Sequence, residues 1–271
     1  MIIEYHRPAT LEDALKLLRR KQPETRPLGG GTLLSAPSAA TVAAVDLQQL
    51  KLNKIALHGK NLHIGATATL QALLDTKDIQ PALAAAIRHE ASYNLRQAAS
   101  VAGSLVGADG RSPFAAAMLA LDAQLEIQPK DETMSYGELL ALPAENLRGK
   151  LITKITISLQ TKLSYQYVAR TLADLPIICI ALGVWPSGRT RLVVDAGQSI
   201  LCECWHGQRG YCHPDQRSDH ARRRVHQRRD RQGYQRHFYQ RDQGRRCNAA
   251  IRNHADDGDG HDQLPALDCA R

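Results

Sequence analysis

A run of three glycines is the first part of the chain whose residue types could bind a ligand. Residues 28–33 read LGGGTL. Without Cβ atoms, Gly29, Gly30 and Gly31 let the backbone turn sharply and direct successive N–H groups at a phosphate. Thr32 adds a hydroxyl donor. The run is neither a GxGxxG dinucleotide loop nor a GxxxxGK[ST] phosphate loop, so these residues alone fit an anion cradle and a plain glycine turn equally well.

A second segment, residues 94–113, is rich in small side chains. It reads NLRQAASVAGSLVGADGRSP. Small residues let a backbone approach a bulky ligand closely. Ser100 and Ser104 offer short hydroxyl donors, and Asp109 can accept a hydrogen bond from a ribose hydroxyl. A tightly packed junction between two helices accounts for the same composition, so this segment by itself also leaves both interpretations open.

The composition of the chain changes abruptly near residue 197. Residues 198–271 hold 14 Arg, 7 His and 5 Cys, no Lys, and seven Leu, Ile, Val, Phe or Met residues. Such a segment cannot bury a core of its own. We hypothesise that it is an out-of-frame translation of a GC-rich gene, because such reading enriches Arg, His, Gln and Cys. The formal net charge of +8 therefore does not describe one uniform surface.

Two functional interpretations of this tail are weak. The possible zinc ligands are Cys202, Cys204, Cys212 and His213. Their spacing, Cys-x-Cys and then an adjacent Cys-His pair, fits poorly with ordinary zinc sites. The basic runs at residues 222–224 and 228–229 suggest a nucleic-acid arm. Ten acidic residues and the absence of Lys argue against such an arm, so we expect neither a metal nor a nucleic acid as partner.

Periodicity and capping signals predict the elements that would position the two small-residue segments. Thr10 is a helix-cap candidate, and Leu11, Ala14, Leu15 and Leu18 fall on one helical face after it. Strands are expected at residues 2–6, 42–47, 125–127 and 151–159, the last two paired, with a hairpin at 186–188 returning through 190–194. Helices are expected at residues 70–74, capped by Thr67 or Thr69, from Pro81 to about Leu95, and up to Leu121.

Targeting and membrane segments are not expected. The N-terminus MIIEYHRPAT has no apolar segment after a basic start, as a signal peptide would. The longest apolar run, residues 175–185, is about half the roughly 20 residues of a membrane span and contains Pro176 and Gly183. The sequence therefore predicts a soluble cytoplasmic protein.

Three segments occur in the order and spacing of one family. The FAD subunits of xanthine dehydrogenase, carbon monoxide dehydrogenase and their relatives have a pyrophosphate loop that LGGGT resembles. Their second flavin loop resembles NLRQAASVAGSLVGAD, and their entry into the C-terminal domain resembles YVARTLADLP. The stretch DGRSPFAAAMLALDAQLEI also looks like the part that follows the second loop. The resemblance covers about residues 1–197.

The resemblance implies an α+β fold. It would be a two-part FAD-binding domain of the vanillyl-alcohol-oxidase/molybdopterin-dehydrogenase type, with FAD between the parts. The parts would be residues 1–57 and 58–160. Residues 161–197 would begin a truncated C-terminal flavoprotein domain. The composition of residues 198–271, which do not resemble the family, predicts a disordered tail in a non-native reading frame.

The resemblance also implies which residues bind FAD; the catalytic residues are not identified. The pyrophosphate loop would be Leu28, Gly29, Gly30, Gly31, Thr32 and Leu33, and the second loop would be Ala99, Ser100, Gly103 and Ser104. Asp109 would lie near the ribose or diphosphate, and Leu151 or Ile152 would pack on the flavin or adenine side. The second loop departs from the family in having Ala102 before Gly103, and the position of Asp109 is compressed. Gln166 stands where many relatives have a Lys, and would favour a negative, reduced flavin less.

The implied function is electron transfer within a larger enzyme. An FAD subunit would relay electrons from iron–sulfur clusters on a small partner subunit to NAD, a quinone or oxygen, and a large partner would hold the molybdenum cofactor. The first 197 residues contain no cluster-spaced cysteines, which agrees with this division. The alternatives are a nucleic-acid-binding protein that uses the basic tail, and a stand-alone flavin oxidase, for which the chain is short.

Overall fold

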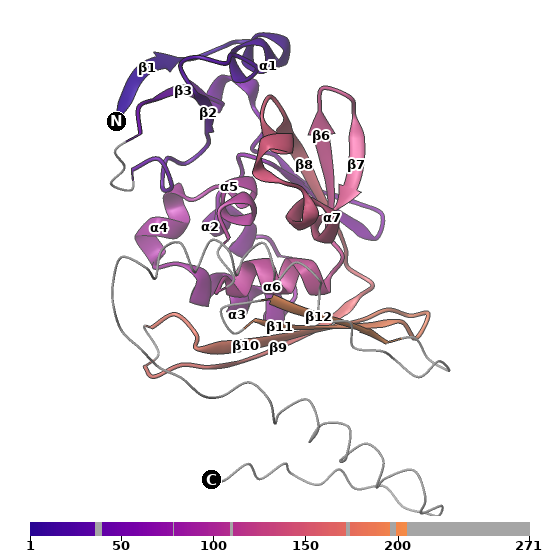
Figure 1. Ribbon diagram of the computed structural model, residues 1–271. Helices are drawn as coiled ribbons and strands as arrows, with labels where there is room; N and C mark the ends of the chain where they lie inside the picture. Colours follow the sequence, from indigo (N-terminus) through magenta and orange to yellow (C-terminus); the bar gives the residue numbers. More distant parts are fainter. Residues whose placement is uncertain (36–39, 78, 109–110, 172–173, 196–198, 205–271) are drawn as a thin grey trace, which may run out of the picture. The chain divides into compact units, whose positions relative to one another are not determined.

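The computed structural model describes residues 1–35, 40–77, 79–108, 111–171, 174–195 and 199–204 (Figure 1). They belong to one compact unit, Met1–Asp219. A second unit, His220–Arg271, lies wholly outside the described residues. Among the residues described, no helix has the length and apolar character needed to cross a membrane.

A three-stranded parallel sheet forms the N-terminal part. Its strands, in spatial order, are β1 (Ile2–His6), β3 (Val42–Asp46) and β2 (Thr25–Leu28). The helix α1 (Leu11–Leu18) buries Ala14, Leu15 and Leu18, and the Thr10 side chain accepts a hydrogen bond from the N–H of Asp13. The predicted strand, cap and apolar face are therefore confirmed. The short 3₁₀ helix η1 (Gln48–Leu50) follows β3.

A five-stranded antiparallel sheet forms the middle part. Its strands, in spatial order, are β4 (Ile55–His58), β5 (Asn61–Gly65), β8 (Leu151–Ser158), β6 (Gln124–Gln128) and β7 (Glu132–Ser135). The central strand β8 comes last in the sequence and pairs with both β5 and β6. Its alternating pattern buries Ile155 and Ile157, so the predicted pairing of these two strands is confirmed.

Helices connect β5 to β6 and β7 to β8. They are α2 (Leu70–Leu74), α3 (Pro81–Glu90), α4 (Tyr93–Ala98), α5 (Val101–Val106), α6 (Pro113–Ala120), α7 (Tyr136–Ala141) and the 3₁₀ helix η2 (Ala144–Leu147). The prediction of one helix from Pro81 to about Leu95 is wrong. The backbone is extended at Ala91 and a new helix begins after Ser92. The freed carbonyl oxygen of Ala91 accepts a hydrogen bond from Arg96 Nη1 at 2.7 Å, which satisfies the break.

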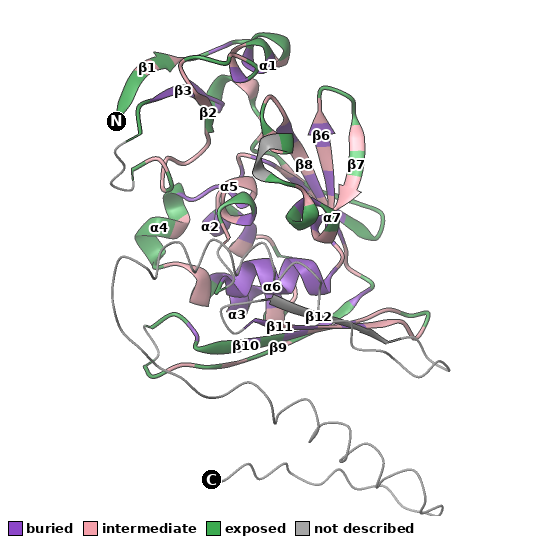
Figure 2. Ribbon diagram, in the orientation of Figure 1, coloured by how far each residue is buried: buried purple, intermediate pink, exposed green. Residues whose placement is uncertain are grey.

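The helix α6 lies in the centre of the core. All eight of its residues are buried (Figure 2), and it contacts α3, β10 and β11. Glu90 holds its start, because Oε2 accepts hydrogen bonds from the Ser112 hydroxyl at 2.7 Å and the Phe114 N–H at 3.1 Å. A carboxylate at a helix N-terminus is favourable for the helix dipole.

A four-stranded antiparallel sheet completes the described part. Its strands, in spatial order, are β12 (Ser199–Cys204), β11 (Thr190–Asp195), β10 (Ile178–Val184) and β9 (Lys162–Val168). The predicted hairpin between β10 and β11 is confirmed. Regular structure extends to Cys204, into the segment that the composition assigns to the tail, because β12 pairs its backbone with the edge of β11.

The two faces of this last sheet differ. One face packs on α3 and α6 and buries Cys179, Ala181 and Val193. On the opposite face, Val168 is 62% exposed and Ile180 is 40% exposed. This second face is therefore apolar, and no described element covers it.

Candidate functional site

The glycine loop begins where β2 ends. Leu28 pairs with Asp46 at the carboxyl ends of two parallel strands, which is where ligand loops sit in open parallel sheets. Gly31 has φ of +75°, a left-handed conformation that glycine adopts without strain. Its carbonyl oxygen accepts hydrogen bonds from the Ser35 N–H at 2.9 Å and the Ser35 hydroxyl at 2.8 Å. The loop therefore closes into a single helical turn.

The backbone donors of this loop are unpaired. Within the part of the chain that the structure describes, the N–H groups from Gly29 to Leu34 donate no hydrogen bond. The loop is partly exposed and Leu33 is 56% exposed. A row of unpaired N–H groups at a turn is a concavity suited to an anion, and this row is the strongest chemical feature of the site.

The glycine loop packs directly on the second segment. A Cβ atom at Gly30 would overlap the carbonyl oxygen of Ala98, and one at Gly29 would lie 2.6 Å from the Ser100 hydroxyl oxygen. A Cβ atom at Gly107 would lie 2.5 Å from Leu33 Cδ1. The structure thus brings together two segments that are far apart in the sequence, and their contact leaves no room for larger side chains.

The second segment is a helix start rather than an open loop. Ser100 is the N-cap of α5, is 6% exposed, and its hydroxyl accepts a hydrogen bond from the Gly103 N–H at 3.3 Å. The Val101 N–H donates to the carbonyl oxygen of Ala68 at 2.8 Å. Most N–H groups of this segment are therefore used internally. The Ser104 hydroxyl is half-buried and makes no hydrogen bond with any described residue, so it can still serve a ligand.

Arg96 anchors the second segment. Its Nε donates to Gln71 Oε1 at 3.0 Å, and Gln71 Nε2 donates in turn to Asp75 Oδ1 at 2.8 Å. Its guanidinium also lies 5.9 Å from the ring centroid of Tyr93, within range of a cation–π contact. Sequence reasoning missed this residue, although an Arg inside a small-residue segment was a usable signal.

A buried carboxylate at the end of β3 was also missed. Asp46 is 3% exposed and accepts hydrogen bonds from the Tyr5 hydroxyl at 2.5 Å and the Gln48 N–H at 2.9 Å. Arg7 Nε lies 3.5 Å from its Oδ2. The hydrogen bond to Asp46 raises the pKa of Tyr5 above its ordinary value. The cluster fixes the sheet edge from which the glycine loop leaves.

The other predicted site residues lie elsewhere. Leu151 is buried among the apolar residues of α1 and β3, and Ile152 is buried in the larger core. Gln166 is exposed on β9 opposite Ile180, on the sheet face turned away from α3 and α6. Asp109 lies outside the described residues. The structure therefore joins residues 28–33 to residues 98–104 and does not bring Gln166 to them.

No metal centre is present in the part of the chain that the structure describes. Within it, no three His, Cys, Asp or Glu side chains gather to hold a metal ion. The side chains of the possible zinc ligands, and the basic runs at residues 222–224 and 228–229, lie outside the described residues.

Comparison with known proteins identifies the family. The sequence pattern of the family described as "FAD binding domain in molybdopterin dehydrogenase" matches residues 1–158. The chain belongs to this family. The Escherichia coli (strain K12) protein "Uncharacterized protein YgfM" is 30% identical to this FAD-binding chain over 197 residues, which cover 72% of the chain and 74% of that protein.

Solved structures share the fold of this FAD-binding chain. Quinoline 2-oxidoreductase from Pseudomonas putida 86 has a TM-score of 0.62 at 21% identity, covering 74% of this chain and 76% of that chain. Carbon monoxide dehydrogenase from Hydrogenophaga pseudoflava has a TM-score of 0.63 at 20% identity, covering 74% and 77%. Reconstituted CO dehydrogenase from Oligotropha carboxidovorans has a TM-score of 0.61 at 22% identity, covering 73% and 77%. The predicted α+β fold is confirmed.

The residues present fit the family's cofactor. FAD carries a diphosphate, and the unpaired N–H groups from Gly29 to Leu34 are donors of the kind that a diphosphate needs. The overlap that a Cβ at Gly30 would meet explains why glycine stands there. The chain is therefore an FAD-binding protein, as the sequence predicted.

Proposed function

We propose that the chain is the FAD-binding subunit of a multi-subunit molybdenum hydroxylase that works in the cytoplasm. Its partners would be a large subunit with the molybdenum cofactor and a small subunit with 2Fe-2S clusters. The row of unpaired N–H groups from Gly29 to Leu34 carries this proposal, together with membership of the family. The likeness to an enzyme described by its molybdenum cofactor agrees with it.

Each loop would have a distinct task. The N–H groups from Gly29 to Leu34 and the Thr32 hydroxyl would hold the diphosphate, and the Ser104 hydroxyl would donate from the facing helix. Asp109 would accept from the ribose, and Leu151 or Ile152 would offer an apolar wall. When bound, FAD would supply the electron-transfer chemistry, between the clusters of the partner and NAD, a quinone or oxygen.

Bound flavin in glycine variants tests the proposed site. Gly30→Ala introduces a Cβ that overlaps the Ala98 carbonyl oxygen and pushes the two loops apart. Gly137→Ala is the matched control, because its Cβ would meet its nearest neighbour at an ordinary 3.6 Å. We expect FAD affinity to fall at least about tenfold in Gly30→Ala and to stay unchanged in the control. Flavin absorbance of the full chain after titration measures it, and equal affinity in both variants would contradict the site.

Co-purification separates the proposed function from its alternatives. We expect the full chain, expressed with its neighbouring genes, to purify with an iron–sulfur partner. Reduction of bound flavin by an organic substrate without any partner would instead indicate a stand-alone oxidase. Purification with nucleic acid and no flavin would indicate the nucleic-acid alternative.

A further inference from the structure

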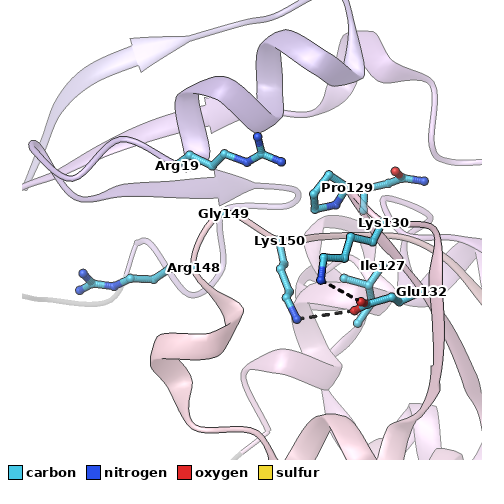
Figure 3. Close-up of a pocket in the computed structure, with 9 residues that line it drawn as sticks. Arg19, Ile127, Pro129, Lys130, Glu132, Arg148, Gly149 and Lys150 are labelled. Atoms are coloured by element: carbon cyan, nitrogen blue, oxygen red, sulfur yellow. Dashed lines mark ion pairs between the residues drawn. The ribbon is translucent and has the colours of Figure 1, made fainter.

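A basic pocket lies at the edge of the N-terminal part, away from the glycine loop. It has a volume of about 190 Å³ and lies between the end of α1 and the β6–β7 hairpin (Figure 3). It shares no lining residue with the glycine loop or the second segment. Its ligand is therefore a separate question from the binding of FAD.

The charges that line this pocket are unbalanced. Four of the lining residues carry a positive charge and one carries a negative charge: they are Arg19, Lys130, Arg148 and Lys150 on one side and Glu132 on the other. Two ammonium groups share that carboxylate: Lys130 Nζ lies 3.5 Å from Oε1 and Lys150 Nζ lies 3.8 Å from Oε2. These are long ion pairs on a partly exposed surface, where such pairs contribute little. The pocket walls therefore keep a surplus of positive charge.

The arginines add to this surplus. The side chains of Arg19 and Arg148 make no ion pair or hydrogen bond with any residue that the structure describes. In Figure 3 the Arg148 side chain points away from the lysines, whereas Arg19 lies across the top of the pocket. Arg19 therefore keeps its charge for a ligand, and Lys150 is the lysine that lies further from Glu132. Asp131, which neighbours the pocket, is already held by a hydrogen bond from Gln128.

The backbone is shaped to keep Arg19 over the pocket. Gly149 has φ of +70°, which side-chain-bearing residues rarely adopt. A Cβ atom there would lie 2.8 Å from Arg19 Cγ. Only glycine therefore lets the chain before β8 pass directly under Arg19 and then present Lys150 from the next position.

We propose that this pocket binds a small, multiply charged oxyanion of the phosphate class. A ligand with two or more negative charges matches the surplus of the walls better than a singly charged ion, because each charge can face its own cation. Arg19 would grip the oxyanion with its planar fork of donors and Lys150 would supply a point charge. Glu132 would weaken the binding by competing for both lysines.

Calorimetric titration of the full, FAD-saturated chain tests the proposal. The probes are inorganic phosphate and pyrophosphate, with chloride replaced so that ionic strength stays constant. The pocket variant is Arg19→Gln with Lys150→Gln. Its control is Lys60→Gln with Lys77→Gln, which removes the same charge from exposed positions outside the pocket. We expect binding of pyrophosphate to weaken at least about tenfold in the pocket variant and to be unchanged in the control.

A variant that is expected to bind more tightly complements the double variant, because misfolding cannot explain a gain in affinity. Glu132→Gln removes the competing carboxylate, so we expect binding a few-fold tighter than in the unaltered chain. The proposal is overturned if the unaltered chain binds neither probe. It is also overturned if both double variants weaken binding alike, because the anion would then sit elsewhere on the basic chain. Loss of binding with Glu132→Gln has the same meaning.

Discussion

Gly29 and Gly30 have a second role that the sequence did not disclose. Their positions in an LGGGT run predicted a phosphate cradle, and the unpaired N–H groups agree with one. The structure adds that the missing Cβ atoms are also needed for packing against Ala98 and Ser100. A pattern of residue types shows local conformational freedom, whereas the contact between distant segments depends on the whole fold. The same limit hid Asp46, whose partner Tyr5 lies on another strand.

Ser100→Ala removes the cap of α5. The hydroxyl accepts the Gly103 N–H, and loss of such a cap costs about 1 kcal/mol of unfolding free energy. We expect urea denaturation to show this loss. Ser187→Ala, at the exposed turn between β10 and β11, is the control and should change nothing. An unaltered midpoint in Ser100→Ala would refute the capping role.

His89 should make stability depend on pH. Burial, and then the charge of Arg88, lower the pKa of His89 below its ordinary 6.5, and its ring lies 3.9 Å from that of Tyr167. Well above pH 6.5 the ring is neutral in both the folded and the unfolded state and contributes no pH dependence. As the pH falls below 6.5, the unfolded chain takes up the proton first, so the folded state loses stability. Urea denaturation between pH 7 and 5 should show a shallower loss in His89→Gln, and an identical slope would contradict this.

At the scale of elements, capping residues in the sequence correctly predicted where two helices begin. Thr10 and Thr69 cap their helices as expected. The break between α3 and α4 carries no Pro or Gly at Ala91, and a hydrogen bond from Arg96 stabilises it. Contacts formed by the folded chain therefore decide such a break, and periodicity cannot show it. Likewise α6 is buried on all sides. It therefore has no polar face from which the sequence could predict which side packs on the core.

Gly183 sets how closely β10 approaches α6. A Cβ atom there would overlap the carbonyl oxygen of Ala120. We expect Gly183→Ala to force the sheet away from the helix and cost about 1–3 kcal/mol. Thermal or chemical unfolding of the full chain measures the cost. Stability equal to that of Gly137→Ala would show that the backbone yields more easily than the packing suggests.

At the scale of the whole molecule, the outer face of the β9–β10 pair has no described cover. Ile178 and Ile180 are exposed there, and residues 205–271 contain only five Leu, Ile, Val, Phe or Met residues. We expect the purified chain to associate in a concentration-dependent way. Ile178→Lys with Ile180→Lys should reduce this in sedimentation velocity, whereas Ile3→Lys on β1 should not. A monodisperse monomer before any substitution would contradict the expectation.

The reading frame of the tail can be settled directly. We propose that the frame shifts near codon 198, because beyond it Arg, His and Cys become frequent, apolar residues become rare and no Lys occurs. Resequencing the gene should show an inserted or deleted nucleotide in this region. The proposal also predicts weak retention of FAD by this product. An intact frame, or full flavin occupancy after purification, would count against it.

The contact between Gly30 and Ala98 also sets an order of events during synthesis. The glycine loop packs on Ala98 and Ser100, which leave the ribosome well after the loop itself. The five-stranded sheet is complete only when β8 pairs with β5 and β6. A nascent chain that ends before Ser158 therefore has the N–H groups from Gly29 to Leu34 but lacks the complete five-stranded sheet that supports the loop. Flavin capture is then a late step in biogenesis, and ribosome-arrested chains of that length should not retain FAD.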